Sequence, residues 1–234
     1  MNGGVATRLA PIAAWMLKSS SPEPTSPALT ARRQQAAARA MCALHGIDAE
    51  TRTIGRRLGG PALLVSNHLG YFDPIVIGGL TACVSVAKRE LLSWPLVGRR
   101  LRDLGVVFVD RSNPWSGARV IRTMLHAFAR GASVLNFSEG TTSDGRTVLP
   151  FRRGAFGAAR IARVPIVPVR IDYDDARIAW YGDATFVPHY LAVLSRGRIR
   201  ASVTFGEPIL PRPGDSAREL ADAVRCAIED LPPP

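Results

Sequence analysis

The stretch "PALLVSNHLGYFDP", residues 61–74, passes from an apolar run into a polar turn and then into a helix start at Asp73 and Pro74. A short apolar run bounded by turn residues is typical of a strand that is buried on both faces. Further strand-like runs follow at 82–87, 106–110, 132–137, 164–171 and 198–206. Helical patterns occupy 74–80, 94–103, 114–130, 154–163 and 215–231. This alternation predicts an α/β fold with a mostly parallel central sheet flanked by helices.

One domain with a separate amino-terminal segment is expected. A chain of 234 residues supports one large core rather than two. Residues 19–30 are rich in Ser and Pro, as linkers are. We therefore expect a flexible or membrane-interfacial segment with its linker over 1–30, and the domain over 31–234. The apolar run 9–17 leaves three alternatives open: a disordered terminus, the core of a signal peptide, or an interfacial anchor with Trp15 at headgroup depth.

The charge balance favours anionic partners. Lys and Arg number 30 against 19 Asp and Glu, which gives a net charge of +11. Such a surface suits an anionic membrane or an acidic substrate. The arginines are scattered and aromatic residues make up only 7%, so no nucleic-acid partner is expected. Cys42, Cys83 and Cys226 lie far apart without CxxC spacing, so neither a disulfide framework nor a metal site is expected.

His68 and Asp73 are the first candidate reacting pair. A neutral imidazole can take a proton from an alcohol, and a carboxylate on its other nitrogen fixes the tautomer. With Gly70 between them, the chain can turn back so that Asp73 reaches His68. The spacing alone favours a structural explanation, in which His68 ends a strand and Asp73 only caps the next helix.

Polar clusters follow two further strands, at the same edge of the expected sheet. The loop "NFSEGTTSDG", residues 136–145, offers N–H groups and hydroxyls that could hold an oxyanion, while Glu139 could bind a substrate hydroxyl. In "VDRS", residues 109–112, Arg111 could clamp a phosphate or a carboxylate. An ordinary turn and a surface ion pair are the structural alternatives.

A serine nucleophile is a further alternative, because three serines lie near the pair in the pattern: Ser66, Ser138 and Ser143. The chain lacks the GxSxG elbow that strains and exposes such a serine. Direct attack by a substrate hydroxyl, with His68 as its base, is the more natural hypothesis.

In order and spacing, these clusters resemble four motifs of the PlsC-type glycerolipid acyltransferases, typified by 1-acyl-sn-glycerol-3-phosphate acyltransferase. The Asn-His-x4-Asp motif stands at 67–73, and Gly-x-x-Phe-[Ile/Val]-Asp-Arg stands at 105–111. Phe-Pro-Glu-Gly-Thr-Arg-Ser corresponds to "FSEGTTS" at 137–143, and the apolar fourth motif corresponds to "VPIVPV" at 164–169. The motif core spans 61–171, and the resemblance implies a fold like that of glycerol-3-phosphate acyltransferase.

The resemblance implies an enzyme that moves a fatty acyl group to the free hydroxyl of a lysolipid in membrane lipid biosynthesis. The donor would be acyl-CoA or acyl carrier protein as co-substrate, with no cofactor. His68 would be the general base and Asp73 its orienter. The resemblance also implies that six further residues bind substrate: Arg111, Glu139, Gly140, Thr141, Thr142 and Arg152.

The third motif departs from the family pattern at two positions. Ser138 replaces Pro, and Thr142 replaces the Arg that phosphatidate-forming members use near the glycerol phosphate. Loss of that guanidinium removes a bidentate phosphate contact, which Arg152 might replace. "EGTTSDG" and the segment 180–189 also resemble members that acylate lyso-ornithine lipid. The acceptor is therefore open between 1-acyl-glycerol-3-phosphate and lyso-ornithine lipid.

Membrane attachment is expected to be peripheral or monotopic, at the cytoplasmic face of the cell membrane. The hydrophobic hairpin usual in the family is missing, and no run reaches the ~20 apolar residues of a spanning helix. The candidate contacts with an anionic membrane surface are Trp15, the basic helix 31–47, and the surface near Trp94, Leu96 and Trp115. A non-catalytic protein that binds anionic lipid is the alternative of another class.

Overall fold

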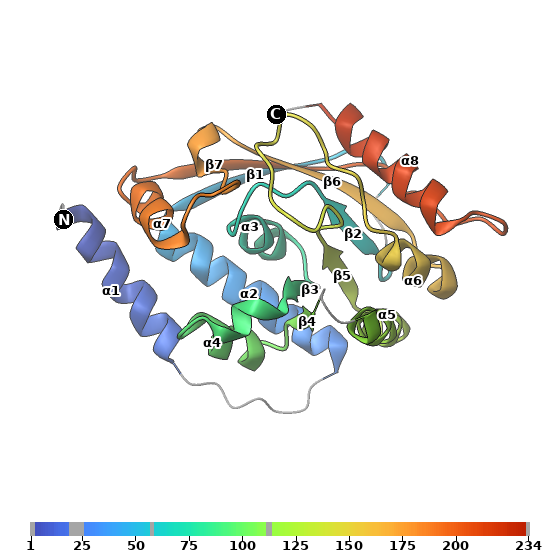
Figure 1. Cartoon of the computed structure of the whole chain (residues 1–234), viewed down its shortest axis with the longest axis horizontal. Coiled ribbons are helices and arrows are strands. Elements are labelled where there is room, and N and C mark those ends of the chain that lie inside the picture. Colours follow the sequence, from blue (N-terminus) through green and yellow to red (C-terminus); the bar gives the residue numbers. More distant parts are fainter. Residues whose placement is uncertain (1–2, 19–25, 57–58, 111–113, 233–234) are drawn as a thin grey trace.

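A computed structural model describes residues 3–18, 26–56, 59–110 and 114–232. Within these ranges seven strands form one sheet in the order β1-β7-β6-β2-β5-β3-β4 (Figure 1). The strands are β1 (Ile47–Thr53), β2 (Leu63–Ser66), β3 (Cys83–Lys88), β4 (Val107–Val109), β5 (Ser133–Asn136), β6 (Ile166–Tyr173) and β7 (Ile199–Phe205). Every neighbouring pair is parallel except β6 with β7. The α/β class and the mostly parallel sheet are confirmed.

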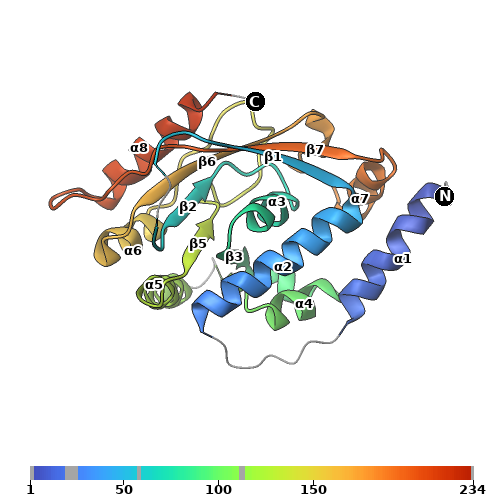
Figure 2. The same ribbon diagram turned by 180° about the vertical axis from the view of Figure 1, so that it is seen from behind.

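Helices cover both faces of the sheet (Figures 1 and 2). They are α1 (Gly3–Leu17), α2 (Pro27–His45), α3 (Asp73–Leu80), α4 (Val97–Asp103), α5 (Pro114–Ala129), α6 (Gly154–Ala162), α7 (Phe186–Leu194) and α8 (Ala217–Asp230), with short 3-10 turns η1 (Arg89–Ser93) and η2 (Ala176–Ile178). Buried side chains of α5, α6 and α8 form the core on one face, and those of α3 and α7 form the core on the other.

Strand β2 shows why its sequence is apolar without alternation. Leu63 and Val65 are fully buried in the core under α5, α6 and α8. Leu64 is buried in the opposite core under α3. Because successive side chains of a strand point to opposite faces, only a run of apolar residues satisfies both cores. The strand then ends at Ser66, directly before the candidate pair.

Three elements differ from the expectation. Residues 47–53 form the edge strand β1 beside β7, where only Ile47 is buried, so the strand carries little apolar signal. Helix α7 forms over Phe186–Leu194, where the sequence predicted no helix. The helix expected over 94–103 begins only at Val97, after Pro95 and after Leu96 at φ 64°.

The amino-terminal residues form helix α1, which packs on the domain. Val5 and Ile12 are buried, and Ile12 lies in a small core with Met41 of α2 and Leu194 of α7. Residues 19–25 of the expected linker lie outside the described residues, and the division of the chain at residue 30 stays a prediction. In the described part of the chain, no helix combines the length and the apolarity needed to cross a bilayer.

Candidate active site

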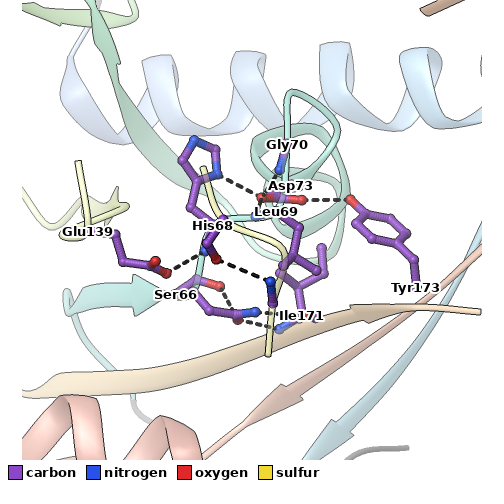
Figure 3. A network of polar contacts seen from close by, with 11 residues as sticks. Ser66, His68, Leu69, Gly70, Asp73, Glu139, Ile171 and Tyr173 are labelled. Carbon is purple, nitrogen blue, oxygen red and sulfur yellow. Dashed lines mark hydrogen bonds and ion pairs between the residues drawn. The ribbon is translucent and has the colours of Figure 1, made fainter. Parts of the chain in front are cut away.

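His68 and Asp73 form a hydrogen-bonded pair at the end of β2. Asp73 Oδ2 lies 2.7 Å from His68 Nδ1, and the aspartate side chain is fully buried while 18% of the imidazole is exposed (Figure 3). A carboxylate can only accept here, so in the neutral imidazole Nδ1 carries the proton and Nε2 has the lone pair. The nitrogen able to act as a base is therefore the one turned away from Asp73.

The Asp73 carboxylate is held by backbone as well as by His68. The amides of Leu69 and Gly70 donate to Oδ2 at 2.6 and 2.8 Å. Asp73 is the first residue of α3, but its carboxylate accepts from the preceding loop rather than capping the helix amides. Charge-assisted bonds of this kind offset the cost of burying the aspartate.

The other carboxylate oxygen of Asp73 accepts from Tyr173. The phenol hydroxyl lies 2.8 Å from Oδ1, across a sequence separation of 100 residues. Burial and the neighbouring Asp73 carboxylate raise the pKa of Tyr173 well above its ordinary value, so the hydroxyl keeps its proton and donates. In Figure 3, Tyr173 and His68 approach Asp73 from opposite sides.

Phe137 sets the plane of the imidazole. Its ring stacks on that of His68 at 4.1 Å between centroids and an interplanar angle of 22°. Ser143 N–H donates to the His68 carbonyl at 2.9 Å, so the loop after β5 also fixes the His68 backbone. These contacts restrict rotation of the imidazole and hold Nε2 in one direction.

Glu139 braces the site through the main chain. Its two carboxylate oxygens accept from His68 N–H at 2.8 Å and from Leu149 N–H at 3.2 Å. Burial raises the pKa of Glu139 to about 7, although these two N–H donors oppose the shift. Both oxygens thus hold backbone, and a contact with the substrate stays a prediction.

The other described residues that were predicted to bind substrate lie, like Glu139, on the loop between β5 and α6. Gly140 has φ +78°, and a Cβ atom at this position would lie 2.6 Å from Arg152 Nε, so the arginine side chain passes directly over the glycine. Arg152 N–H in turn donates to the Ser138 carbonyl at 2.8 Å. Thr141 is exposed and Thr142 is half-buried on the same loop. Five of the six predicted substrate-binding residues thus lie on the loop that Glu139 and Ser143 join to the His68 backbone, and their contact with substrate stays a prediction.

Arg111 lies outside the described residues. The strand that precedes it, β4, is separated from β2 by β5 and β3. That separation is about 14 Å at the usual spacing between strands. Asp110, next to Arg111, pairs with Arg89 at 2.8 Å.

The serine alternative gains no support from the geometry. Ser66 donates to the Asn67 side chain at 3.3 Å, Ser138 accepts from Asn136 at 2.6 Å, and Ser143 accepts from Gly145 N–H at 3.3 Å. A serine nucleophile needs a hydrogen bond to its base. Across the described residues, no such bond joins any of the three hydroxyls to the His68 ring.

The sequence did not predict two residues that contact the pair: Phe137 stacks on His68, and Tyr173 donates to Asp73. Phe137 begins the third motif, but nothing in the pattern indicates stacking on His68. Tyr173 is the last residue of β6, two positions beyond the predicted strand end. A polar residue at the carboxyl end of a strand is a weak signal that could have marked it.

The arrangement can take a proton from a hydroxyl placed at His68 Nε2. Over the described ranges, no three side chains of the types that bind metal ions gather at one point. Asn67 does not face the imidazole, because its side chain bonds both backbone groups of Ile171 at 2.9 Å and ties β2 to β6. The geometry is that of an imidazole hydrogen-bonded to a buried carboxylate at the end of β2, and their roles as base and orienter stay predictions.

A family model described as acyltransferase matches residues 13–172, and the chain belongs to this family. A lyso-ornithine lipid O-acyltransferase of Brucella abortus (strain 2308) is 32% identical over 199 residues, covering 77% of this chain and 74% of the relative. A second, of Rhizobium meliloti (strain 1021), is 34% identical, covering 64% and 57%. The crystal structure of the 1-acyl-sn-glycerophosphate acyltransferase PlsC from Thermotoga maritima matches with a TM-score of 0.59 and 22% identity over 85% of this chain and 77% of that one, which supports the fold.

Proposed function

We propose that the protein transfers a fatty acyl group from a thioester donor, acyl-CoA or acyl carrier protein, to the hydroxyl of a lysolipid. His68 Nε2 takes the proton of the acceptor hydroxyl as its oxygen attacks the thioester carbonyl. The carbon–sulfur bond then breaks, and the departing thiolate takes the proton back from the imidazolium. Asp73 keeps the proton of the neutral imidazole on Nδ1 and stabilises the imidazolium.

The observation that carries the proposal is the 2.7 Å contact between His68 Nδ1 and the buried Asp73 carboxylate. A protein that only binds anionic lipid would have no use for an imidazole oriented in this way. The loop after β5, whose Ser143 amide already contacts the His68 backbone, is the proposed place of the groups that stabilise the oxyanion of the tetrahedral intermediate. Thr141, Arg152 and Arg111 are the proposed contacts to the acceptor or donor.

Lyso-ornithine lipid is the proposed acceptor. Thr142 occupies the position at which phosphatidate-forming members of the family carry Arg, so a bidentate phosphate contact is absent there. Both relatives described above carry the name lyso-ornithine lipid O-acyltransferase. 1-Acyl-glycerol-3-phosphate is the second candidate, because His68 and Asp73 act on the acceptor hydroxyl and do not themselves select the headgroup.

A donor-by-acceptor assay tests this proposal. Purified protein is given acyl-CoA or acyl carrier protein with either lyso-ornithine lipid or lysophosphatidate, and the lipid products are identified by mass spectrometry. We expect acylated lyso-ornithine lipid, with kcat/KM for lysophosphatidate lower by about tenfold or more, the order of one lost charge-assisted contact.

The His68→Ala protein, purified in the same way, gives the background activity of acyltransferases carried over from the expression host, and this background is subtracted. A preference for lysophosphatidate would overturn the proposed acceptor and leave acyl transfer in place. If no thioester were consumed with any acceptor, the non-catalytic alternative would be correct.

We also propose that one edge of the molecule binds the anionic surface of the cell membrane, at the cytoplasmic face of that membrane. Helix α1 turns an apolar row outward: Ala10, Pro11, Ala13, Ala14 and Leu17. Helices α4 and α7 both contact α1. Leu96, directly before α4, and Val187, on α7, are exposed. We call these seven residues the apolar edge. Helix α1 is therefore apolar both on the face that packs on the domain and on the face exposed to solvent. Such a helix is suited to the interface between water and lipid.

Aromatic rings join this edge to the active site. Trp94 lies 4.5 Å from Phe186, and Phe186 lies 5.1 Å from Tyr71, measured between ring centroids. Tyr71 stands two residues before Asp73. Exposed Arg99 and Arg102 on α4 supply positive charge beside the edge. A lysolipid held in the bilayer would thus meet a continuous apolar surface that leads toward His68.

A further inference from the structure

The two oxygens of the Asp73 carboxylate have different partners. Three donors reach Oδ2: His68 Nδ1 at 2.7 Å, Leu69 N–H at 2.6 Å and Gly70 N–H at 2.8 Å. Oδ1 receives the Tyr173 hydroxyl at 2.8 Å (Figure 3). The phenol therefore lies on the far side of the carboxylate from the imidazole, and it influences His68 only through Asp73.

The sheet, rather than a loop, positions the Tyr173 hydroxyl. Tyr173 ends β6 and pairs in antiparallel register with Ala201 of β7. Two residues earlier, Ile171 exchanges two 2.9 Å hydrogen bonds with the Asn67 side chain, directly before His68. The strand that carries the phenol and the strand that carries the imidazole are thus tied together, which fixes the distance between the two side chains.

A phenol that donates to a carboxylate draws negative charge from it. The remaining charge stabilises the imidazolium less, and the carboxylate plane is held so that Oδ2 points at Nδ1. We propose that Tyr173 is a positioning residue of the proposed reaction, one that orients Asp73 and limits how strongly Asp73 favours the protonated form of His68. This inference rests on the proposed function of His68 as the base.

Other titratable groups surround the pair and bear on any pH measurement. Glu139 interacts electrostatically with Asp73, and its pKa of about 7 falls in the range where a histidine titrates. Cys42 of α2 and Tyr71 of the loop between β2 and α3 interact electrostatically with Tyr173. Burial raises the pKa of Cys42 and that of Tyr71. A pH–rate profile therefore mixes contributions of His68 and Glu139, so the imidazole itself must be followed.

The test is an NMR titration of the His68 ring in the whole chain. The chain has 4 histidines, and the signal that vanishes in His68→Ala assigns the ring. In Tyr173→Phe we expect the His68 titration midpoint to rise by about half a pH unit, because Asp73 regains charge. The acid limb of kcat/KM should move in the same direction, with kcat lower by about three- to tenfold.

The matched control is Tyr190→Phe, which also removes a tyrosine hydroxyl from a histidine network. That hydroxyl lies 2.7 Å from Nε2 of the buried His45, whereas the hydroxyl that reaches the Asp73 carboxylate is that of Tyr173. Its loss is expected to lower thermal stability while leaving the His68 midpoint unchanged. A purely structural role of Tyr173 would make the two variants behave alike.

A second measurement covers the case in which Tyr173→Phe folds poorly. Replacement of all tyrosines by 3-fluorotyrosine makes the phenol a stronger donor, so the His68 midpoint should fall rather than rise. An unchanged or oppositely shifted midpoint in the folded variant, or with the fluorinated protein, would overturn the inference while leaving the proposed function intact. Near wild-type activity of His68→Ala would instead overturn the proposed function itself.

Discussion

Asp73 carries a charge in a fully buried position and is stabilised there by directed hydrogen bonds. Two backbone amides, one phenol and one imidazole donate to it. Replacement by alanine would leave these donors without an acceptor, at about 1–3 kcal/mol for each buried group. Loss of activity in Asp73→Ala would therefore mix a chemical defect with a folding defect. His68, which is partly exposed, is the better residue for a test of the chemistry.

Glu139 makes the stability of the fold depend on pH. Its folded pKa of about 7 lies above the ordinary value of 4.5, so the folded state binds the proton more tightly than the unfolded chain. The corresponding stabilisation is complete below pH 4.5 and is lost as the pH rises through 7. From pH 5 to 8, the free energy of unfolding of the wild type should fall by roughly 3 kcal/mol relative to Glu139→Gln.

Urea denaturation at several pH values checks this prediction. Glu219→Gln is the control, because hydrogen bonds from Ser216 lower the pKa of that exposed carboxylate. Its contribution is lost only as the pH falls below the ordinary value of 4.5, so its difference from the wild type should stay level between pH 5 and 8. A level difference for Glu139→Gln as well would contradict the raised pKa of Glu139 and the burial that causes it.

At the scale of the elements, the sequence predicted the strands that have a local apolar pattern. The apolar run before Asn67 indicated β2, and the same type of signal indicated the other five strands of the motif core and its flank. Strand β1 escaped because an edge strand with one buried residue carries no periodic apolar signal. Helix α7 was also missed, because none of the helical patterns found in the sequence covers Phe186–Leu194.

The candidate site divides in the same way. The spacing of His68 and Asp73 permits their contact, because five residues with a glycine can close such a turn, and the four motifs in register indicated the pair. Glu139 reaches the His68 amide across 71 residues, and Tyr173 reaches Asp73 across 100. No local pattern encodes contacts at these separations, since they depend on which strands become neighbours. The order β6-β2-β5 brings these residues together.

At the scale of the whole molecule, the apolar edge predicts how the protein meets a membrane. Leu17 and Val187 are exposed by 60% each and belong to α1 and α7, which contact one another. Replacement of both by Asp removes apolar contact and adds negative charge, so binding to vesicles that contain phosphatidylglycerol should weaken by about tenfold or more. Co-sedimentation with these vesicles measures the change.

Ile161→Asp is the matched control for that experiment. Ile161 is exposed by 62% on α6, which lies at the opposite end of the molecule from α1 (Figures 1 and 2). Exposed substitutions of this kind change stability by about 0.5 kcal/mol or less, so folding should be preserved in both proteins. The control adds one negative charge and the double variant adds two, so an equal loss of binding per added charge would show that net charge, rather than the apolar edge, determines attachment.

The most direct measurement of the central claim is the turnover of the acyl thioester by His68→Ala beside the wild type, with lyso-ornithine lipid as acceptor. Equal thermal stability of the two proteins shows that the fold is retained. Without the base that takes the hydroxyl proton, kcat should fall by about a thousandfold. Turnover close to that of the wild type would contradict the claim that His68, held by Asp73, activates the acceptor.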